Sequence, residues 1–314
     1  MKARLWLGIL ALALSASVGC QRGGLSPGEG RIEVPGGRIW YRIVGSGTKT
    51  PLLVLHGGPG MSSAYLSPLA ALADERPVIF YDQLGAGRSD RPTDSTLWTV
   101  DRFVQEIPRI RQALGLREVH LYGHSWGTIL AVEYLLTQPQ GVRSVILSSP
   151  AISIPMWIRD SDTLRATMPD SIQGAIDRHE RDGTTQDPEY QAGMMAYYAR
   201  YLARRTPWSA DIDSTFAQMN PRIYGLMQGP SEFTITGTLK NYDRTAELGK
   251  IHTPTLFVCG EYDEARPPTV ARYSSLVPGS RLEIIPNAGH LTMQDEPQRH
   301  AAVVRTFLHE VESR

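Results

Sequence analysis

The sequence predicts an α/β fold, in which a mostly parallel central sheet carries helices on both faces and a helical cap is inserted late in the chain. Three observations lead to this prediction. From about residue 31, short apolar runs alternate with amphipathic stretches. Most of these runs are continuously apolar, as in strands that are buried on both faces. One long stretch, 151–243, interrupts the alternation and contains no clear strand.

Seven runs are predicted to be strands. The first, RIWYRIV (38–44), alternates in polarity and is typical of an exposed edge strand. The later runs predict strands inside a parallel sheet. They are PLLVLHG (51–57), PVIFYD (77–82), EVHLYGHS (118–125), SVILSSP (144–150), TPTLFVCG (253–260) and RLEIIPN (281–287).

The stretches between these strands are predicted to be helices. Their ranges are 64–73, 100–114, 126–137, 268–276 and 297–312. The interrupting stretch is also predicted to be helical, because its segment YQAGMMAYYARYLARR has apolar residues at helical spacing. Its many Met and Tyr residues suit an adaptable cleft lining, although most of them would pack the insertion's own core. The predicted domains are therefore a core, 31–150 and 244–314, and a helical cap, 151–243.

The first twenty residues predict an export signal. Lys2 and Arg4 precede an apolar stretch of about 15 residues, which is shorter than the roughly 20 that span a bilayer. The small residues before Cys20 resemble a bacterial lipobox, in which the cysteine is acylated, although Ser17 stands where that pattern prefers Leu. We expect an exported lipoprotein of the cell envelope, anchored to the membrane through Cys20. A plain secretory signal and a secreted soluble protein are the alternative.

The segment that follows the signal, QRGGLSPGEG (21–30), predicts a flexible tether before the first folded residue. If Cys20 is lipidated, Cys259 is the only remaining thiol and no intrachain disulfide can form. Because Cys259 lies inside the apolar run TLFVCG, we expect a small buried hydrophobic residue rather than a reactive group.

Charge and motif content exclude several functions. Lys plus Arg equals Asp plus Glu at 32 each, so no net field attracts polyanions, and nucleic acid is not an expected partner. The chain has no H-E-x-x-H motif and no Cys/His cluster at ligand spacing, so no metal site is expected. It also has no phosphate-binding or dinucleotide-binding glycine motif, so no cofactor is expected.

The motif GHSWG (123–127) matches G-x-S-x-G between a predicted strand and a predicted helix. In a nucleophile elbow of this kind the chain turns sharply, and the flanking glycines make room for a strained, exposed serine hydroxyl. Ser125 is therefore the candidate nucleophile. The segment GLSPG (24–28) matches the same pattern, but no strand or helix surrounds Ser26, which we interpret as a chance match.

A nucleophilic serine needs a base, and the base needs an acid that fixes its tautomer. On this type of sheet the expected chain order is Ser, acid, His. Asp263, after the run TLFVCG, and His290, after the run RLEIIPN, fit that order. The rival acids are Glu261 and Glu264, and the rival bases are His300 and His309, which lie on the last predicted helix as surface or packing residues. His120, His124 and His252 are interpreted as structural.

An oxyanion hole requires two N–H donors, and losing one costs about 2.7–4 kcal/mol of barrier lowering. The loop HGGPG (56–60) follows a strand and is the natural second source beside the elbow. Gly58 and Trp126 are the predicted donors. Asp82, at the end of PVIFYD, follows the wrong strand for an aspartate nucleophile, and we expect it to hold the glycine-rich loop after it.

Five motifs together resemble the proline iminopeptidases of the α/β-hydrolase superfamily, which are serine peptidases. They are HGGPG, DQLGAGRSD, GHSWGT, GEYDEARP and NAGH, and they occur in the order typical of that family, around a matching insertion. The resemblance runs from about residue 30 to the end. It implies an α/β-hydrolase fold whose insertion is a helical cap over the site. It also implies two glutamates that hold the substrate's free amino group, here Glu232 in GPSEFTITG and Glu264 directly after the triad acid.

Physical chemistry supports this implied role, because an ammonium that enters a water-poor pocket needs carboxylates to offset its lost hydration. Without the resemblance, Glu264 would be a solvated loop residue or a partner of Arg266, and Glu232 a helix-capping surface residue. The expected substrate is a small peptide or an amino-acid amide, because relatives of this family also cleave proline amide. An esterase or lipase on the same triad, or a non-catalytic ligand-binding protein, are the alternatives.

Overall fold

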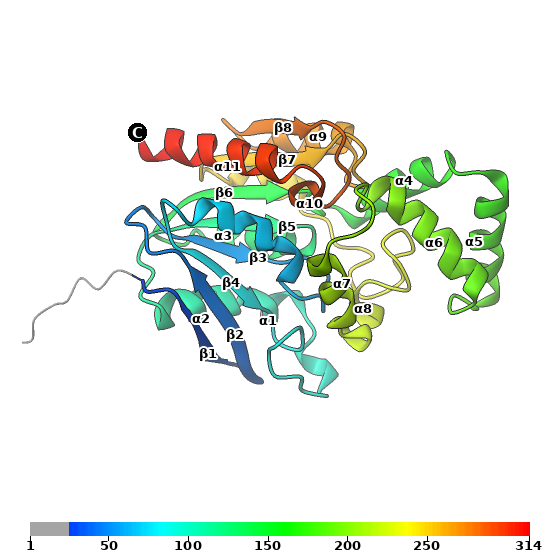
Figure 1. Ribbon diagram of the computed structural model, residues 1–314, viewed down its shortest axis with the longest axis horizontal. Helices are drawn as coiled ribbons and strands as arrows, with labels where there is room; N and C mark the ends of the chain where they lie inside the picture. Colours follow the sequence, from blue (N-terminus) through cyan, green and yellow to red (C-terminus); the bar gives the residue numbers. More distant parts are fainter. Residues whose placement is uncertain (1–24) are drawn as a thin grey trace, which may run out of the picture.

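The computed structural model describes residues 25–314 (Figure 1). The predicted export signal, Cys20 and the first part of the predicted tether lie outside this range. Within 25–314, no helix has the length and apolar character that a membrane crossing requires.

The strands form one eight-stranded sheet with the order β1-β2-β4-β3-β5-β6-β7-β8. The pairs β1/β2 and β2/β4 are antiparallel, and every other neighbouring pair is parallel. The predicted α/β-hydrolase fold is thus confirmed. The strands are β1 (Gly28–Val34), β2 (Gly37–Val44), β3 (Leu52–Leu55), β4 (Val78–Asp82), β5 (Val119–His124), β6 (Val142–Ser148), β7 (Thr255–Gly260) and β8 (Arg281–Ile285).

Strand β1 is the one strand that the sequence pattern missed. Residues 28–30, assigned to the tether, are its first three residues and pair with β2. The strand lies at the sheet edge with most side chains in solvent, so only Ile32 and Val34 are buried. A strand is recognised in a sequence by apolar residues at every second position. Here only two such residues occur, among glycines and charged residues, which is too few to identify the strand.

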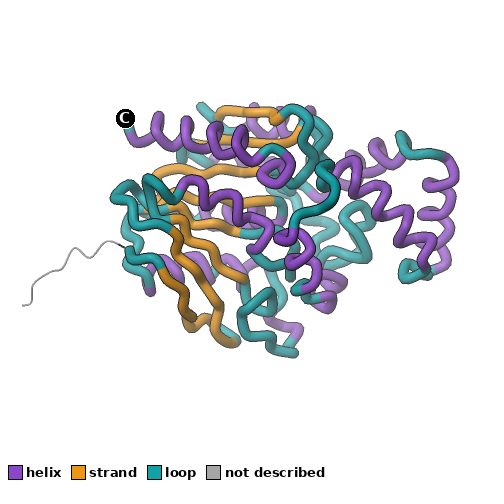
Figure 2. Tube along the Cα trace, in the orientation of Figure 1, coloured by secondary structure: helices purple, strands orange, loops and turns teal. Residues whose placement is uncertain are grey.

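Helices cover both faces of the sheet (Figure 2). Side chains of α1, α2, α3 and α9 join one hydrophobic cluster, and those of η1 and α11 join the other. The predicted helix 100–114 is divided at Gln105, and the predicted helix 64–73 is a 3-10 helix that contains Pro68. The bounds are η1 (Ala64–Leu72), η2 (Ser95–Leu97), α1 (Val100–Val104), α2 (Glu106–Ala113), α3 (Trp126–Leu136), α9 (Pro267–Leu276), α10 (Thr292–Asp295) and α11 (Pro297–Glu312).

The segment between β6 and β7 contains five α-helices, in agreement with its predicted helical character. Figure 1 shows α4, α5 and α6 projecting to one side of the sheet, with α7 and α8 nearer to it. A bridge between Ser153 and Asp243 joins the start of this insertion to its end. The helices are α4 (Ile154–Arg165), α5 (Asp170–Asp182), α6 (Pro188–Tyr201), α7 (Ala210–Ala217) and α8 (Pro221–Met227), and η3 (Thr245–Lys250) follows them.

Candidate active site

Ser125 lies at the turn between β5 and α3 in a backbone conformation that side chains rarely adopt, with φ 53° and ψ −123°. Its N–H donates to the carbonyl of Ser148 on the neighbouring strand (3.0 Å), which fixes the turn. A Cβ on Gly127 would lie 2.1 Å from the carbonyl oxygen of Leu55, and one on Gly123 would lie 2.6 Å from that of Gly127. Only glycine fits at either position, as the G-x-S-x-G pattern predicted.

The structure brings the predicted acid and base into direct contact. His290 Nδ1 lies 2.8 Å from Asp263 Oδ1, and both side chains are buried. Asp263 also accepts the backbone N–H groups of Ala265 (2.8 Å) and Gly260 (3.1 Å). With its carboxyl group held at three points, Asp263 can fix the orientation and tautomer of the imidazole.

Ser125 and His290 line one cavity, together with Gly58 and Glu232. The carboxyl ends of β5, β7 and β8 therefore converge where the elbow, the acid and the base were predicted. The rest of the wall is mainly apolar. It comprises Gly57, Met61, Tyr65, His124, Leu202, Ile212, Thr215, Phe216 and Leu291.

The rival acid Glu261 and the two rival bases lie away from this cavity. Glu261 is exposed and accepts the N–H of Asn287. His300 is buried among hydrogen-bonding hydroxyls of the core, and this burial lowers its pKa to about 3. His309 lies on the surface beside Glu75. Ser26 is exposed outside any strand or helix.

Asp82 holds a loop, as expected. Its Oδ1 accepts the N–H (2.7 Å) and the hydroxyl (2.8 Å) of Ser63, and its Oδ2 accepts the N–H of Arg88 (2.9 Å). A carboxyl group engaged by three donors has no role as a nucleophile here.

The two predicted oxyanion donors lie on two separate segments, the HGGPG loop and the start of α3. Trp126 is the first residue of α3, where a backbone N–H has no partner within the helix. Gly58 lies in the HGGPG loop with φ 121°, and its N–H makes no hydrogen bond to the described residues. Both Gly58 and Trp126 also border a smaller cavity that Ser125 and Glu232 share. The arrangement offers two N–H groups to negative charge that develops beside the serine.

His124 was interpreted as structural, and the structure shows which parts of the site it joins. The N–H of Gly57 donates to Tyr65 Oη (2.7 Å), and that hydroxyl donates to His124 Nδ1 (2.8 Å). His124 Nε2–H in turn donates to the carbonyl of His290 (3.0 Å). Burial holds the pKa of His124 well below its usual range, which favours the neutral ring that this chain of bonds requires. A histidine next to the elbow serine was the available signal, but its two partners, Tyr65 and His290, come from segments far apart in the chain.

Glu232 lies in the segment between α8 and β7, and its side chain faces the same cavity as Ser125. Its Oε1 accepts the hydroxyl of Tyr224 (2.7 Å), and its carbonyl accepts Trp157 Nε1–H (2.7 Å). It is buried rather than a surface helix cap. Burial raises the pKa of the Glu232 carboxyl, although the nearby His290 opposes this shift.

Glu264 is completely buried, and neither of its carboxyl oxygens has a hydrogen-bond partner within residues 25–314. The alternative partner, Arg266, pairs with Asp160 instead (3.3 Å). Burial, and then the charges of Glu232 and Asp263, raise the pKa of Glu264 well above its usual value. A native structure rarely leaves a buried acidic group unpaired unless a ligand or water completes it.

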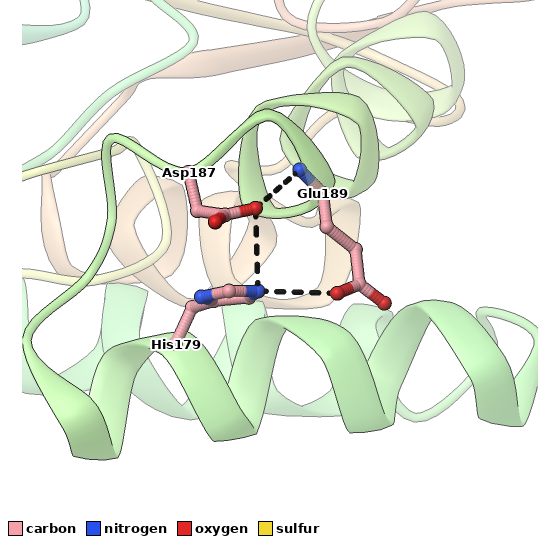
Figure 3. Close-up of side chains that lie close together, drawn as sticks. All are labelled: His179, Asp187 and Glu189. Atoms are coloured by element: carbon pink, nitrogen blue, oxygen red, sulfur yellow. Dashed lines mark hydrogen bonds and ion pairs between the residues drawn. The ribbon is translucent and has the colours of Figure 1, made fainter.

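One group of potential metal ligands occurs in the described part of the chain, in the cap where α5 meets α6 (Figure 3). Protein contacts already explain its geometry. Asp187 Oδ1 caps α6 by accepting the N–H of Glu189 (2.8 Å), and His179 Nε2 lies 3.2 Å from Glu189 Oε2. Arg178 pairs with the same Glu189 oxygen, so a cation already occupies that side. We interpret the group as a helix cap with an ion-pair cluster.

Comparison with known proteins places this site in a family. The family model for the alpha/beta hydrolase fold matches residues 50–297. A proline iminopeptidase of Heyndrickxia coagulans is 46% identical over 287 residues, covering 90% of this chain and 99% of the relative. The chain belongs to the proline iminopeptidase family. A second member, from Saccharolobus solfataricus, is 37% identical and covers 91% of this chain and 93% of its own.

Solved structures agree with this membership. The proline iminopeptidase of Mycobacterium smegmatis superposes with a TM-score of 0.85 at 34% identity, covering 90% of this chain and 98% of its own. VinJ gives a TM-score of 0.88, also at 34% identity, covering 91% of this chain and 100% of its own. The family resemblance expected from the five motifs is confirmed, and the chain is a member of an enzyme family.

Proposed function

We propose that this member of the proline iminopeptidase family is a serine aminopeptidase that releases an N-terminal residue, preferably proline, from small peptides or amides. The observation that carries the proposal is one cavity lined by Ser125, His290 and Glu232, with Asp263 behind the histidine. The cavity therefore combines acyl-transfer groups with a buried carboxyl group suited to an amino terminus.

Acylation uses Ser125, His290 and Asp263. His290 Nε2 takes the hydroxyl proton as Ser125 Oγ attacks the carbonyl carbon, and the tetrahedral oxyanion accepts the N–H groups of Gly58 and Trp126. His290 then gives that proton to the leaving nitrogen as the amide bond breaks. Asp263 stabilises the imidazolium that forms between these two transfers.

Deacylation repeats the sequence with water. His290 removes a proton from the water, whose oxygen attacks the acyl carbon, and the proton returns to Ser125 Oγ as the ester bond breaks. The products are the free amino acid and the shortened peptide, or ammonia when the substrate is a simple amide. The amide hydrolase is thus an alternative on the same machinery.

The glutamates supply the preference for a free amino group. Glu232 faces the cavity, and Glu264 is buried close enough to Glu232 for their charges to interact, with no hydrogen bond from its carboxyl group to the described residues. An ammonium brings positive charge and N–H donors to these groups, which favours their ionised form and offsets the substrate's lost hydration. An esterase on the same triad would make no use of two buried glutamates. A non-catalytic binding protein would make no use of the strained elbow, which costs about 1–3 kcal/mol.

The decisive experiment compares the wild type with Ser125→Ala on proline arylamide, proline amide and a neutral ester. We expect the wild type to prefer the two amine-bearing substrates, and the variant to lose at least ~10⁴-fold in kcat on all three. Unimpaired turnover by Ser125→Ala would refute the mechanism. Equal kcat/KM for the ester and the arylamide in the wild type would instead favour the esterase.

For the location of the protein, we infer from the sequence alone an exported lipoprotein with its acyl anchor on Cys20. The cationic residues, the short apolar stretch and the lipobox-like residues support this inference. Mass spectrometry of the protein from a membrane fraction should show an acylated Cys20 as the N-terminus. A mature chain that begins elsewhere and stays in the soluble fraction would favour the plain secretory signal.

A further inference from the structure

Gln83, in the motif DQLGAGRSD, makes contacts for which the triad chemistry gives no reason. It is fully buried directly after β4. Its side-chain Nε2–H donates to the carbonyl of His56 (2.9 Å), and its Oε1 accepts the indole Nε1–H of Trp126 (2.8 Å). Its backbone N–H donates to His56 Nε2 (2.9 Å). One amide side chain therefore joins the HGGPG loop to the residue after the nucleophile.

The chemistry of the partners fixes the orientation of this amide. An indole N–H can only donate and a carbonyl can only accept, so the Gln83 oxygen must face Trp126 and its nitrogen must face His56. His56 is held in turn, because its Nδ1–H donates to the carbonyl of Gly57 (2.8 Å) while its Nε2 accepts. Burial lowers the pKa of His56, which keeps the ring neutral for these two roles.

The two segments joined by Gln83 are those that carry the oxyanion donors. Gly58 follows His56 by two residues, and Trp126 carries the second donor on its own backbone. Because an oxyanion hole works only when both N–H groups point at the same atom, their relative position matters more than either one alone. The loop glycines have no side chains with which to hold that position.

We propose that Gln83 is a positioning residue for the oxyanion hole, which it aligns by tying the HGGPG loop to the indole of Trp126. This inference rests on the proposed function, since it assigns Gln83 to the transition state of that reaction. Gln83 touches no reacting atom. Its effect should appear in the stability of the tetrahedral intermediate, and thus in kcat for amide and ester alike.

The test uses Gln83→Leu, which leaves the carbonyl of His56 and the indole N–H of Trp126 without their side-chain partner. It also uses Trp126→Phe, which removes only the indole donor and keeps the backbone N–H. We expect kcat to fall about 10- to 100-fold in Gln83→Leu and less in Trp126→Phe, with KM changed less than threefold. The double variant should be no worse than Gln83→Leu alone, because the bridge is already broken.

The matched control is Ser144→Ala. It removes another buried hydrogen bond, from Ser144 to His120 (2.7 Å), at the other end of the neighbouring strands. Its thermal stability should fall as in the Gln83 variant, while its kcat stays at the wild-type value. A prolyl boronic acid, which forms a tetrahedral adduct with the serine, should bind Gln83→Leu more weakly by the same factor as kcat/KM falls. Free proline should bind equally to both.

Several outcomes would overturn the proposal. These are a wild-type kcat in folded Gln83→Leu, losses that add in the double variant, or unchanged boronic acid affinity. If Gln83→Leu does not fold, Trp126→Phe becomes the test. A wild-type kcat in that variant would refute the proposal that Gln83 aligns the oxyanion hole through the indole of Trp126. Ser125→Ala distinguishes failure of the positioning role from failure of the proposed reaction. If kcat is lost in Ser125→Ala but stays at the wild-type value in Gln83→Leu, only the positioning role is rejected.

Discussion

Two sets of buried polar groups at the site, which we call the core wall and the glutamate wall, differ in how their hydrogen bonds are satisfied. On the core wall, Asp263 holds three donors and Gln83 joins two loops. On the glutamate wall, Glu232 from the cap has one side-chain hydrogen bond, and Glu264, in the core loop after β7, has none to the described residues. The polar groups of the core wall are thus satisfied within the protein and are organised for the reaction. The glutamate wall lacks a partner of opposite charge, which a bound ammonium would supply.

This difference separates two kinds of energetic contribution. Groups already fixed by the protein need no reorganisation when charge develops, so they act on kcat. Groups that form their hydrogen bonds only with the bound substrate contribute to substrate binding, so their loss changes mainly KM and the choice of substrate. Variants on the two walls should therefore give different kinetic signatures, with the larger losses on the core wall.

The largest expected loss of kcat on the core wall is that caused by Asp263→Asn. Asp263 Oδ1 accepts from both His290 and Ala265, and Oδ2 accepts from Gly260. The NH₂ group of an asparagine must therefore face either the first two donors or the third, and the donors that it faces lose their acceptor. We expect kcat to fall about 10⁴-fold on arylamide and ester alike, with KM nearly unchanged. Steady-state kinetics on both substrates measure this. A loss below tenfold would show that the acid of the triad lies elsewhere, and Glu261→Gln is the exposed control, with no expected loss.

A smaller effect, restricted to amine-bearing substrates, is expected from Glu232→Gln and Glu264→Gln. Each removes a charge-assisted hydrogen bond to the substrate ammonium, worth about 1.5–3 kcal/mol, so kcat/KM for proline arylamide should fall about 10- to 100-fold through KM. Turnover of a neutral ester should change less than threefold. If both substrates lose equally in either variant, the glutamates are structural and the difference between the two walls disappears.

The core wall could be predicted further from the sequence than the glutamate wall. Ser125, Asp263 and His290 follow apolar runs in a fixed chain order, so each position carried a local signal, and parallel strands bring such ends together. The roles of Gln83 and His124 could not be predicted from local sequence, because their hydrogen-bond partners come from segments far apart in the chain. The unpaired state of Glu264 was equally hidden, since it depends on where Arg266 points in the folded protein. Strand β1 was missed because an edge strand buries too few residues to show a period.

The pH dependence of substrate binding tests whether the glutamate wall holds the substrate's ammonium group. Burial raises the pKa of both Glu232 and Glu264, so these carboxyls keep their protons to higher pH than a solvated glutamate does. The ammonium is held best when they are ionised, so KM for proline arylamide should fall as pH rises through the raised pKa values. The ester KM should stay flat over the same range. Parallel pH profiles of KM for the two substrates would contradict this account, and Glu264→Gln should flatten the arylamide profile.

The smallest expected effect is on the stability of the unliganded protein. A carboxyl whose pKa is raised by folding binds more protons in the folded than in the unfolded state, so its contribution to stability is lost as pH rises above the unfolded value of about 4.3. Glu264→Gln removes this titration. Relative to the wild type, the variant should therefore become more stable as the pH rises above about 4.3, and each kcal/mol of gained stability should raise Tm by about 2–4 °C. Thermal unfolding at several pH values measures the gain, and saturating proline should reduce it by supplying the wild type with the missing cation. A difference that is independent of both pH and proline would mean that Glu264 is paired within the protein, and the glutamate wall would then be as complete as the core wall.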